Sequence, residues 1–171
     1  TPTRELALQV QQTFSQIGRL KKIRCAAIFG KQPFMQQRNE LRQRVHVVIG
    51  TPGRTLDHLE KEHLDLSQIR WLILDEADKM LELGFIEQVE AIIGRVSQNR
   101  TTLVFSATMS EPVEQLCRQY MRTPQRIAIM ATKALQDKIS QSWLAVSDND
   151  KFHLTIHLLD KLQPSRRILF C

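Results

Sequence analysis

The sequence lacks several features that would assign it to a particular class of protein. Among its 171 residues, no apolar run approaches the ~20 residues that a helix needs to cross a membrane, so we expect no membrane partner. No signal peptide is visible. The three cysteines, Cys25, Cys117 and Cys171, are far apart and lack the spacing of a zinc site. We interpret them as buried free thiols of a protein in a reducing compartment, the cytoplasm.

A further absence concerns phosphate binding. The pattern G-x-x-x-x-G-K-[ST], whose backbone N–H groups and lysine cradle the phosphates of a nucleotide, occurs nowhere in the chain. The sequence also has no initiator Met, and it stops within an expected strand. We therefore expect an internal piece of a longer protein, and we do not expect these residues alone to bind a nucleoside triphosphate usefully.

What the sequence does contain fits a folded globular chain with a basic surface. Hydrophobic residues make up 42%, and 24 Lys and Arg stand against 18 Asp and Glu, which gives a net charge of +6. A basic balance favours a polyanionic partner such as nucleic acid, although an ordinary basic surface has the same composition. The length permits one domain, or one domain and part of another.

Helical and strand patterns alternate along the chain, which predicts an α/β fold with a parallel sheet covered by helices on both faces. Apolar residues recur every three or four positions from Leu6 to Ile17, so the first helix is expected to be amphipathic, with Gly18 closing it. A mostly polar helix over 32–43 has Phe34 and Leu41 on one side. Strands are expected at residues 23–29, 45–49, 69–74, 102–105 and 126–130.

The pattern changes after residue 130. Residues 131–140 have no strong periodicity and are interpreted as a linker. A strand at 141–146, a helix at 150–162 and a strand at 166–171 then restart the alternation. We therefore predict a first domain over residues 1–130, the linker, and the beginning of a second domain over 141–171.

The most informative segment is Asp75-Glu76-Ala77-Asp78, which follows the apolar run Trp71-Leu72-Ile73-Leu74. A short apolar run that ends in acids is typical of a buried strand that delivers carboxylates to the edge of a sheet. Ligands of open α/β sheets bind beyond the carboxyl ends of the strands. In nucleotide chemistry, one such carboxylate can hold a metal ion and another can act on the attacking water. A solvated acidic turn is the alternative.

Three further clusters lie in order along the chain: Pro2-Thr3-Arg4-Glu5-Leu6-Ala7, Thr51-Pro52-Gly53-Arg54 and Ser106-Ala107-Thr108. Together with Asp75-Glu76-Ala77-Asp78, this set resembles the DEAD-box family of ATP-dependent RNA helicases. The resemblance extends to Ile168-Leu169-Phe170-Cys171, which is similar to the first strand motif of that family's second domain. It implies a RecA-like parallel sheet flanked by helices, truncated at its N-terminus, and a site that takes ATP, Mg²⁺ and RNA.

The resemblance also implies roles for the acidic segment and its neighbour. Asp75 would hold Mg²⁺ through water, and Glu76 would activate the hydrolytic water. Asp78 would tie this turn to Ser106 and Thr108, which link the nucleotide state to domain closure. Read alone, Asp78 could equally cap a helix, and Ser-Ala-Thr is a common turn.

The RNA-binding residues implied by the resemblance are Pro2, Thr3, Arg4, Gly30, Thr51, Pro52, Gly53 and Arg54. Helix starts offer free N–H groups to phosphate, and an arginine adds a bidentate contact, so these segments would grip the sugar-phosphate backbone without reading bases. Surface salt bridging is the alternative for the two arginines.

Two segments each allow two interpretations. The family usually has two adjacent glycines where this chain has Phe29-Gly30, so Phe29 is either a core residue or a platform for a base or ribose. The basic run over residues 19–24 could track phosphates, or it could be a solvated loop.

Three functions are compatible with these observations. The first is an ATP-dependent RNA helicase that remodels RNA duplexes or ribonucleoprotein complexes, with ribosomal complexes among its partners. The second is a non-catalytic RNA-binding relic of a helicase, which the missing phosphate loop keeps open. The third is another nucleotide-driven machine, such as a DNA helicase or an AAA-type ATPase, against which Pro-Thr-Arg-Glu-Leu-Ala and Thr-Pro-Gly-Arg argue.

Overall fold

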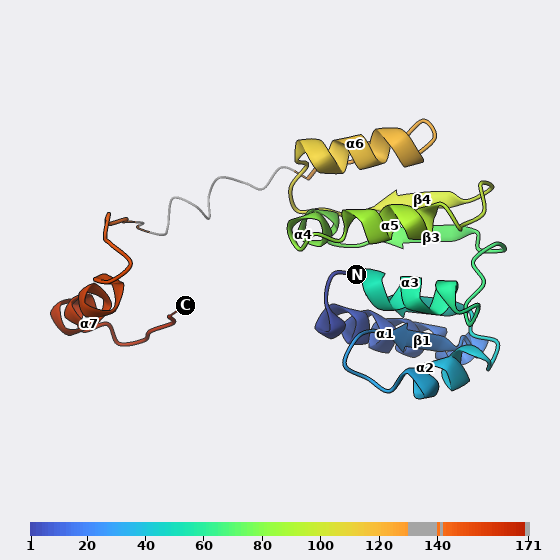
Figure 1. Cartoon of the computed structure of the whole chain (residues 1–171), viewed down its shortest axis with the longest axis horizontal. Helices are drawn as coiled ribbons and strands as arrows, with labels where there is room; N and C mark the ends of the chain where they lie inside the picture. The colour runs from blue at the N-terminus through green and yellow to red at the C-terminus, as the bar shows by residue number, and fades with distance from the viewer. Residues whose placement is uncertain (130–139, 141, 170–171) are drawn as a thin grey trace. The chain divides into compact units, whose positions relative to one another are not determined.

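A computed structural model describes residues 1–129, 140 and 142–169. The chain divides into two compact units, Thr1–Arg126 and Ile127–Cys171. The first unit contains α1 (Arg4–Gly18), η1 (Arg19–Lys21), β1 (Cys25–Ile28), α2 (Phe34–Leu41), β2 (Val47–Gly50), α3 (Pro52–Glu60), β3 (Trp71–Leu74), α4 (Ala77–Glu82), α5 (Ile86–Ile93), β4 (Thr101–Val104) and α6 (Glu111–Tyr120), and Figure 1 labels most of these elements. The second unit contains α7 (Lys151–Leu162).

The four strands of the first unit pair in parallel, as the alternating pattern predicts. They form two pairs: β1 with β2, in which Cys25 lies opposite Val47, and β3 with β4, in which Trp71 lies opposite Thr101. Strands at four of the five positions predicted before residue 130 are confirmed within two residues at each end. The α/β class is therefore correct.

Helices cover both faces of the β1–β2 sheet. Ala27 and Ile49 pack with Ala7 of α1 on one face, whereas Ala26 and Ile28 pack with Leu41 of α2 on the other. This arrangement explains why both strands consist almost entirely of apolar residues, since helices cover both faces.

The β3–β4 sheet differs from the prediction because only one of its faces is covered by the described residues. Leu72 and Leu74 point into a core built with α4, α5 and α6, which lie close to this sheet in Figure 1. The alternate side chains Trp71 and Ile73 face the other way, and Trp71 is 61% exposed. The run from Trp71 to Leu74 was expected to form a buried strand, but Trp71 and Ile73 are exposed in the described structure.

The first helix is amphipathic, but part of its apolar stripe faces outward. Ala7 is buried against the β1–β2 sheet, and Gly18 ends the helix as predicted. A Cβ atom added to Gly18 would lie 2.5 Å from Cβ of Ile23, so only glycine allows the chain to turn back this closely. Ile17, in contrast, is 77% exposed.

Three predicted strands are absent from the described residues. Residues 126–129, 142–146 and 166–169 form no strand, because a strand requires a hydrogen-bonded neighbour and none lies beside them in this part of the structure. The predicted linker lies outside the described residues except for residue 140. The helix predicted at 150–162 is confirmed as α7. No helix in the described part of the chain is both long and apolar enough to cross a membrane.

Candidate functional site

The acidic segment after β3 lies directly beside the Ser-Ala-Thr segment after β4. The register pairs Leu74 with Val104, so both strands end at the same edge of their sheet. Two backbone hydrogen bonds extend the pairing past the strand ends. Phe105 N donates to Leu74 O (2.8 Å), and Ala77 N donates to Phe105 O (3.0 Å). The backbone therefore brings the two predicted motifs together.

Asp78 joins the two segments through its carboxylate and its backbone. Its Oδ2 accepts hydrogen bonds from Thr108 N and Thr108 Oγ1, both at 2.8 Å, and its N–H donates to Ser106 Oγ at 3.2 Å. Ser106 Oγ in turn donates to Thr108 O at 2.7 Å. The hydrogen bond from the Thr108 hydroxyl, helped by N–H groups, lowers the pKa of Asp78, so this carboxylate is ionised at neutral pH.

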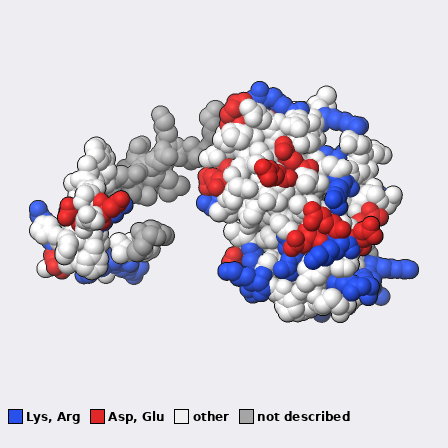
Figure 2. All heavy atoms as spheres, in the orientation of Figure 1, with Lys and Arg blue, Asp and Glu red and all other residues white. Residues whose placement is uncertain are grey.

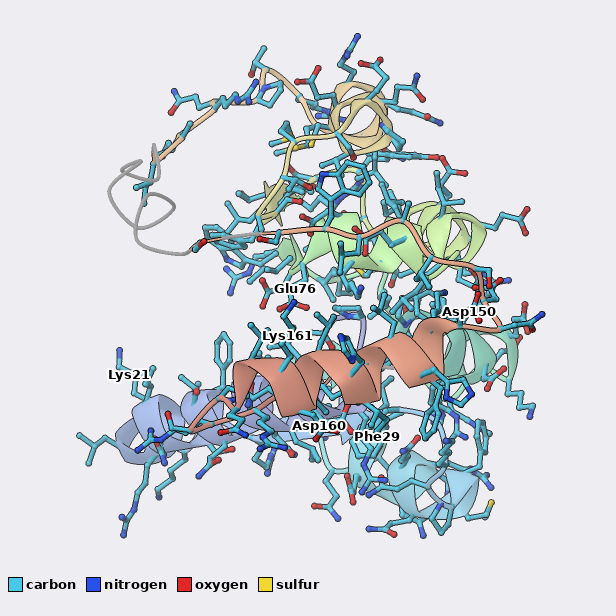
Figure 3. All side chains as sticks on the ribbon, turned by 90° about the vertical axis from the view of Figure 1, so that its left-hand side faces the viewer. Lys21, Phe29, Glu76, Asp150, Asp160 and Lys161 are labelled. Carbon is cyan, nitrogen blue, oxygen red and sulfur yellow. The ribbon has the colours of Figure 1, made fainter. Side chains whose placement is uncertain are left out.

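Asp75 and Glu76 lie at the same edge with fewer constraints. Asp75 Oδ1 accepts a hydrogen bond from Glu76 N at 3.1 Å, and the Glu76 side chain is exposed (Figure 3). The backbone of Glu76 is left-handed, with φ 51° and ψ 53°. This conformation costs about 1–2 kcal/mol for a residue with a Cβ atom, and such strain is frequent at functional sites. The strain turns the chain sharply from β3 into α4.

These acids are compatible with a magnesium ion that is held through water and phosphate oxygens as well as carboxylates. The described residues contain no group of three or more His, Cys, Asp or Glu that could hold a metal ion by themselves. Mg²⁺ usually keeps several waters and is held by one or two carboxylates together with phosphate oxygens. Asp75 acting through water is compatible with that chemistry, whereas a cage made only of protein ligands is not.

The Pro-Thr-Arg and Thr-Pro-Gly-Arg segments lie together at the corresponding edge of the β1–β2 sheet. Thr1 N donates to Gly50 O at 2.9 Å, which places the start of α1 beside the start of α3. Thr3 caps α1, because its Oγ1 accepts a hydrogen bond from Leu6 N at 3.2 Å. Pro52 is buried in the first turn of α3, and Thr51 precedes it in extended conformation.

The two edges adjoin. Burial lowers the pKa of the Thr1 α-amino group, and the negative charges of Asp75 and Glu76 act in the opposite direction. The acids of one strand pair are therefore close enough to influence the edge of the other. All four predicted motifs thus lie at the carboxyl ends of strands in one unit.

Phe29 belongs to the core. Its side chain is 1% exposed and packs with Ala7, Ala27 and Ile49, while the Arg4 guanidinium lies 5.1 Å from the centre of its ring. The interpretation of Phe29 as a core residue is therefore confirmed, and a base cannot stack on it. Gly30 follows it at the surface, and a Cβ atom added there would meet nothing within 4 Å.

Arg54 points into the protein rather than freely into solvent. Its Nη1 donates to Gln32 O at 3.1 Å and to Gln37 Oε1 at 3.0 Å, and its side chain is only 15% exposed. Its Nε also lies 3.5 Å from Asp57 Oδ2. The Arg54 guanidinium therefore forms an ion pair, as the salt-bridge interpretation predicted, and it also donates two hydrogen bonds within the protein.

Sequence analysis did not identify Gln37, which is the centre of this network. The Gln37 side chain is fully buried, and its Nε2 donates to Phe29 O at 2.9 Å and to Gln32 Oε1 at 3.0 Å. One amide therefore connects the turn at Gly30 to Arg54 of α3. A signal was available, because Gln37 falls between Phe34 and Leu41 at helical spacing and shares their buried face.

His58 is a second buried polar residue that the sequence analysis did not identify. Its ring is fully buried, stacks on Phe34 at 4.1 Å between centroids, and has Nε2 3.3 Å from Gln37 Oε1. Burial, followed by the positive charges of His63 and Arg54, lowers the pKa of His58 to about 4. The ring is therefore neutral at pH 7, and Nε2 must carry the proton if it is to donate to Gln37.

Comparisons with known proteins agree with this arrangement. The pattern of the DEAD/DEAH box helicase family matches residues 1–116. The chain is 47% identical over 171 residues to the ATP-dependent RNA helicase DbpA of Bacillus subtilis, covering all of this chain and 36% of that protein. It is 40% identical over 169 residues to the DEAD-box ATP-dependent RNA helicase CshA of Bacillus cereus, covering 99% of this chain and 32% of that protein. The chain thus spans about a third of the length of these relatives.

Solved structures give the same result. A DEAD box protein from the hyperthermophile Methanococcus jannaschii superimposes with a TM-score of 0.73 at 37% identity, covering 93% of this chain and 42% of that one. A hypothetical ATP-dependent RNA helicase from Sulfolobus tokodaii gives 0.70 at 37% identity, covering 73% of this chain and 38% of that one. The chain belongs to the DEAD/DEAH box helicase family, and the predicted RecA-like α/β fold is confirmed.

The Gln37 network predicts a specific loss of stability. Replacing Gln37 with Leu keeps a similar volume but removes the side-chain partner of Phe29 O and one of the partners of the Arg54 guanidinium at a buried position. We expect the free energy of unfolding to fall by about 2–4 kcal/mol, since each unsatisfied buried group costs about 1–3 kcal/mol. Urea unfolding followed by circular dichroism measures the change.

Gln36→Leu is the matched control, because Gln36 is exposed and bonds only the Glu40 side chain. Its effect should stay within about 0.5 kcal/mol. Equal effects of the two substitutions would contradict the importance of the network.

His58 predicts a defined dependence of stability on pH. The pKa of His58 in the folded state, about 4, lies below its ordinary value of 6.5, so the unfolded chain binds the proton more tightly. The contribution of His58 to stability is therefore complete above pH 6.5 and is lost as the pH falls towards 4. Unfolding in urea at several pH values should show this decline, and His58→Gln should reduce its slope. A variant that keeps the full slope would show that other groups are responsible.

Proposed function

We propose that the whole protein is an ATP-dependent RNA helicase, in which RNA-stimulated ATP hydrolysis drives local unwinding of RNA duplexes or remodelling of ribonucleoprotein complexes. The observation that carries this proposal is the bridge from Asp78 to Ser106 and Thr108. It fixes the acids of β3 at the edge where ligands of α/β sheets bind. The relatives named above are themselves described as ATP-dependent RNA helicases.

Within this proposal, each acid has a separate task. Asp75 would hold Mg²⁺ through water, and this ion, when bound, neutralises charge on the phosphates of ATP. Glu76 has an exposed carboxylate and can accept a proton from the attacking water. Asp78 is less suited to that task, because both of its oxygens already accept hydrogen bonds and these lower its pKa. Its role is to connect the nucleotide edge to Ser106 and Thr108.

RNA would bind along the edge formed by the starts of α1 and α3. Both helices begin there with free backbone N–H groups, which attract phosphate oxygens. Thr3 and Thr51 lie at these starts, and Gly30 and Gly53 leave space for a close approach of the backbone. Contacts of this kind recognise the sugar-phosphate chain in any sequence. The residues proposed to bind RNA are Pro2, Thr3, Arg4, Gly30, Thr51, Pro52, Gly53 and Arg54.

Arg54 has a modified role in this proposal. Because its guanidinium is largely enclosed by Gln32, Gln37 and Asp57, it contributes mainly by holding α3 against the turn at Gly30. Arg4, in contrast, is exposed and can reach a phosphate directly.

The proposal includes an arrangement of domains and a setting. Residues 1–130 would form the first RecA-like domain, 131–140 a linker, and 141–171 the start of a second. Cys25 and Cys117 are free thiols, which supports a reducing compartment such as the cytoplasm. Ribosomal or other ribonucleoprotein complexes are proposed as partners.

A non-catalytic RNA-binding protein is the second candidate, because this sequence contains no G-x-x-x-x-G-K-[ST]. The two candidates differ in a chimera in which these 171 residues replace the matching segment of the Bacillus subtilis relative. A helicase segment should support RNA-stimulated ATP hydrolysis there, whereas a relic should bind RNA without hydrolysis.

The role of Glu76 predicts the behaviour of Glu76→Gln in that chimera. The amide keeps the shape of the side chain but cannot act as a base, so RNA-stimulated hydrolysis should fall about 10²–10⁴-fold while ATP binding is retained. Phosphate release and binding of a fluorescent ATP analogue measure the two properties. Glu87→Gln removes the same charge from an exposed position of α5 and should have no effect. Hydrolysis by Glu76→Gln at the parent rate would refute the assignment.

The proposed role of Gly53 predicts that Gly53→Ala weakens RNA binding without lowering the stability of the protein. A Cβ atom at this position would meet nothing in the protein, and Ala favours a helix by about 1 kcal/mol over Gly, so Gly53→Ala should not lower the melting temperature. If RNA approaches this backbone closely, the same methyl group should weaken binding of single-stranded RNA. Fluorescence anisotropy with a labelled RNA measures this.

Gly50→Ala is the contrasting variant, because its Cβ atom would clash with the side chains of Thr55 and Ile28. It should lower the melting temperature. Unchanged RNA binding by Gly53→Ala would exclude a close approach at the start of α3.

A further inference from the structure

The positive charge of this chain is concentrated in one stretch. Residues 19–44 hold eight of the 24 Lys and Arg but one of the 18 Asp and Glu, so their net charge of +7 exceeds the +6 of the whole chain. On the face shown in Figure 2, Lys and Arg gather over the part of the first unit that contains α1, β1 and α2. The remainder of the chain is almost neutral.

Two separate segments of this stretch meet at the amino ends of β1 and β2. Arg24 N donates to His46 Nδ1 at 3.1 Å, and the Arg24 guanidinium donates to Arg44 O through Nε at 3.1 Å and Nη2 at 2.9 Å. These bonds place Arg24, at the end of residues 19–24, beside Arg44, at the end of residues 42–44. We call the result the basic patch, and it consists of Arg19, Lys21, Lys22, Arg24, Arg42 and Arg44.

The cations of the basic patch are exposed and carry no counter-charge. None of the six forms an ion pair with an acid of the described residues, whereas Arg54, Lys79, Arg118 and Arg126 all do. Figure 3 shows Lys21 projecting outward at the edge of the unit. Six like charges without acids repel one another, so the patch is an arrangement that a polyanion would stabilise.

The backbone conformation of two residues of the basic patch is a second observation. Lys22 and Arg44 each precede a strand in left-handed conformation, with φ of 54° and 52°. Gly or Asn would adopt this conformation with less strain, because it brings Cβ close to the following carbonyl. At both turns the chain nevertheless has a cation.

We propose that the basic patch is a second RNA-binding surface, which holds phosphates of RNA that extends beyond the edge at α1 and α3. The inference rests on the proposed function for the identity of the polyanion. The two surfaces lie at opposite ends of the same four-residue strands, β1 and β2, so one RNA can reach both. No aromatic residue belongs to the patch, so it binds phosphate without stacking bases. It should therefore strengthen binding of long RNA without sequence preference.

An anionic membrane is the competing partner. Ile17 and Leu20 are exposed beside the patch, and Leu20 is 95% exposed. A membrane-binding surface needs a broad apolar face that the cations flank. Here Leu20 is the one exposed apolar side chain of residues 19–24, and residues 42–44 contribute none. This distribution favours a polyanion that follows the sheet edge.

The test uses the full 171-residue chain and two single-stranded RNAs, one of about 6 nucleotides and one of about 30. The patch variant is Lys21→Gln with Arg42→Gln, since neither side chain makes a hydrogen bond to the described residues. The control pair, Arg95→Gln with Arg122→Gln, removes the same charge from exposed positions of the same unit. Circular dichroism verifies that all variants are folded.

The patch variant should bind the long RNA about tenfold more weakly near physiological salt, and its salt slope should fall by about 1.4, because each phosphate contact to a single strand contributes about 0.7. Its binding of the short RNA should not change. The control pair should bind both RNAs like the parent chain, and Gly53→Ala should weaken both.

Several results would overturn the inference. Equal losses in the patch and control pairs, or equal losses for both RNA lengths in the patch variant, would indicate a general effect of charge. Unchanged RNA binding, with loss of binding to vesicles of phosphatidylglycerol and phosphatidylcholine, would assign the patch to membranes. If the parent chain bound neither RNA, the RNA-binding part of the proposed function would fail as well.

Discussion

The hydrogen bonds from Thr108 to the Asp78 carboxylate hold the candidate active site together. They connect residues 30 positions apart and define where the chain leaves both β3 and β4. The N–H of Asp78 binds Ser106 at the same time, so the two segments are joined at three points. Hydrogen bonds to an ionised group contribute more than those between neutral groups, because the charge strengthens the attraction. A change that moves one segment must therefore move the other or break these bonds.

The buried amide of Gln37 serves a comparable purpose at the other strand pair. Gln37 touches the backbone of Phe29, the side chain of Arg54 and the ring of His58, so it fixes the turn after β1 relative to α3. The network is polar and enclosed, which makes each missing partner costly. The positions of the residues proposed to bind RNA thus depend on the buried side chains of Gln37 and His58.

The sequence predicted the parts of this structure that depend on local pattern. Four strands follow from apolar runs, and the end of the first helix follows from its periodicity and Gly18. The meeting of Asp78 with Ser106 and Thr108 was implied by the family resemblance. The hydrogen-bond partners of Gln37 and His58 were not predicted, because they lie up to 21 residues away and no spacing rule connects them. The exposure of Trp71 was not predicted either, since an apolar strand residue gives no information about which face is covered.

The arrangement of charge follows from the direction of the strands. Carboxylates of Asp75, Glu76 and Asp78 gather at the carboxyl ends of one strand pair, and the basic patch lies at the amino ends of the other. The Debye length is about 8 Å at physiological salt, so each cluster acts mainly on the groups next to it. Phosphates approaching the three carboxylates meet repulsion that a divalent cation must offset, whereas phosphates approaching the basic patch meet attraction at once. An RNA would therefore be attracted to the patch without a metal ion, and the nucleotide edge would become attractive only together with one.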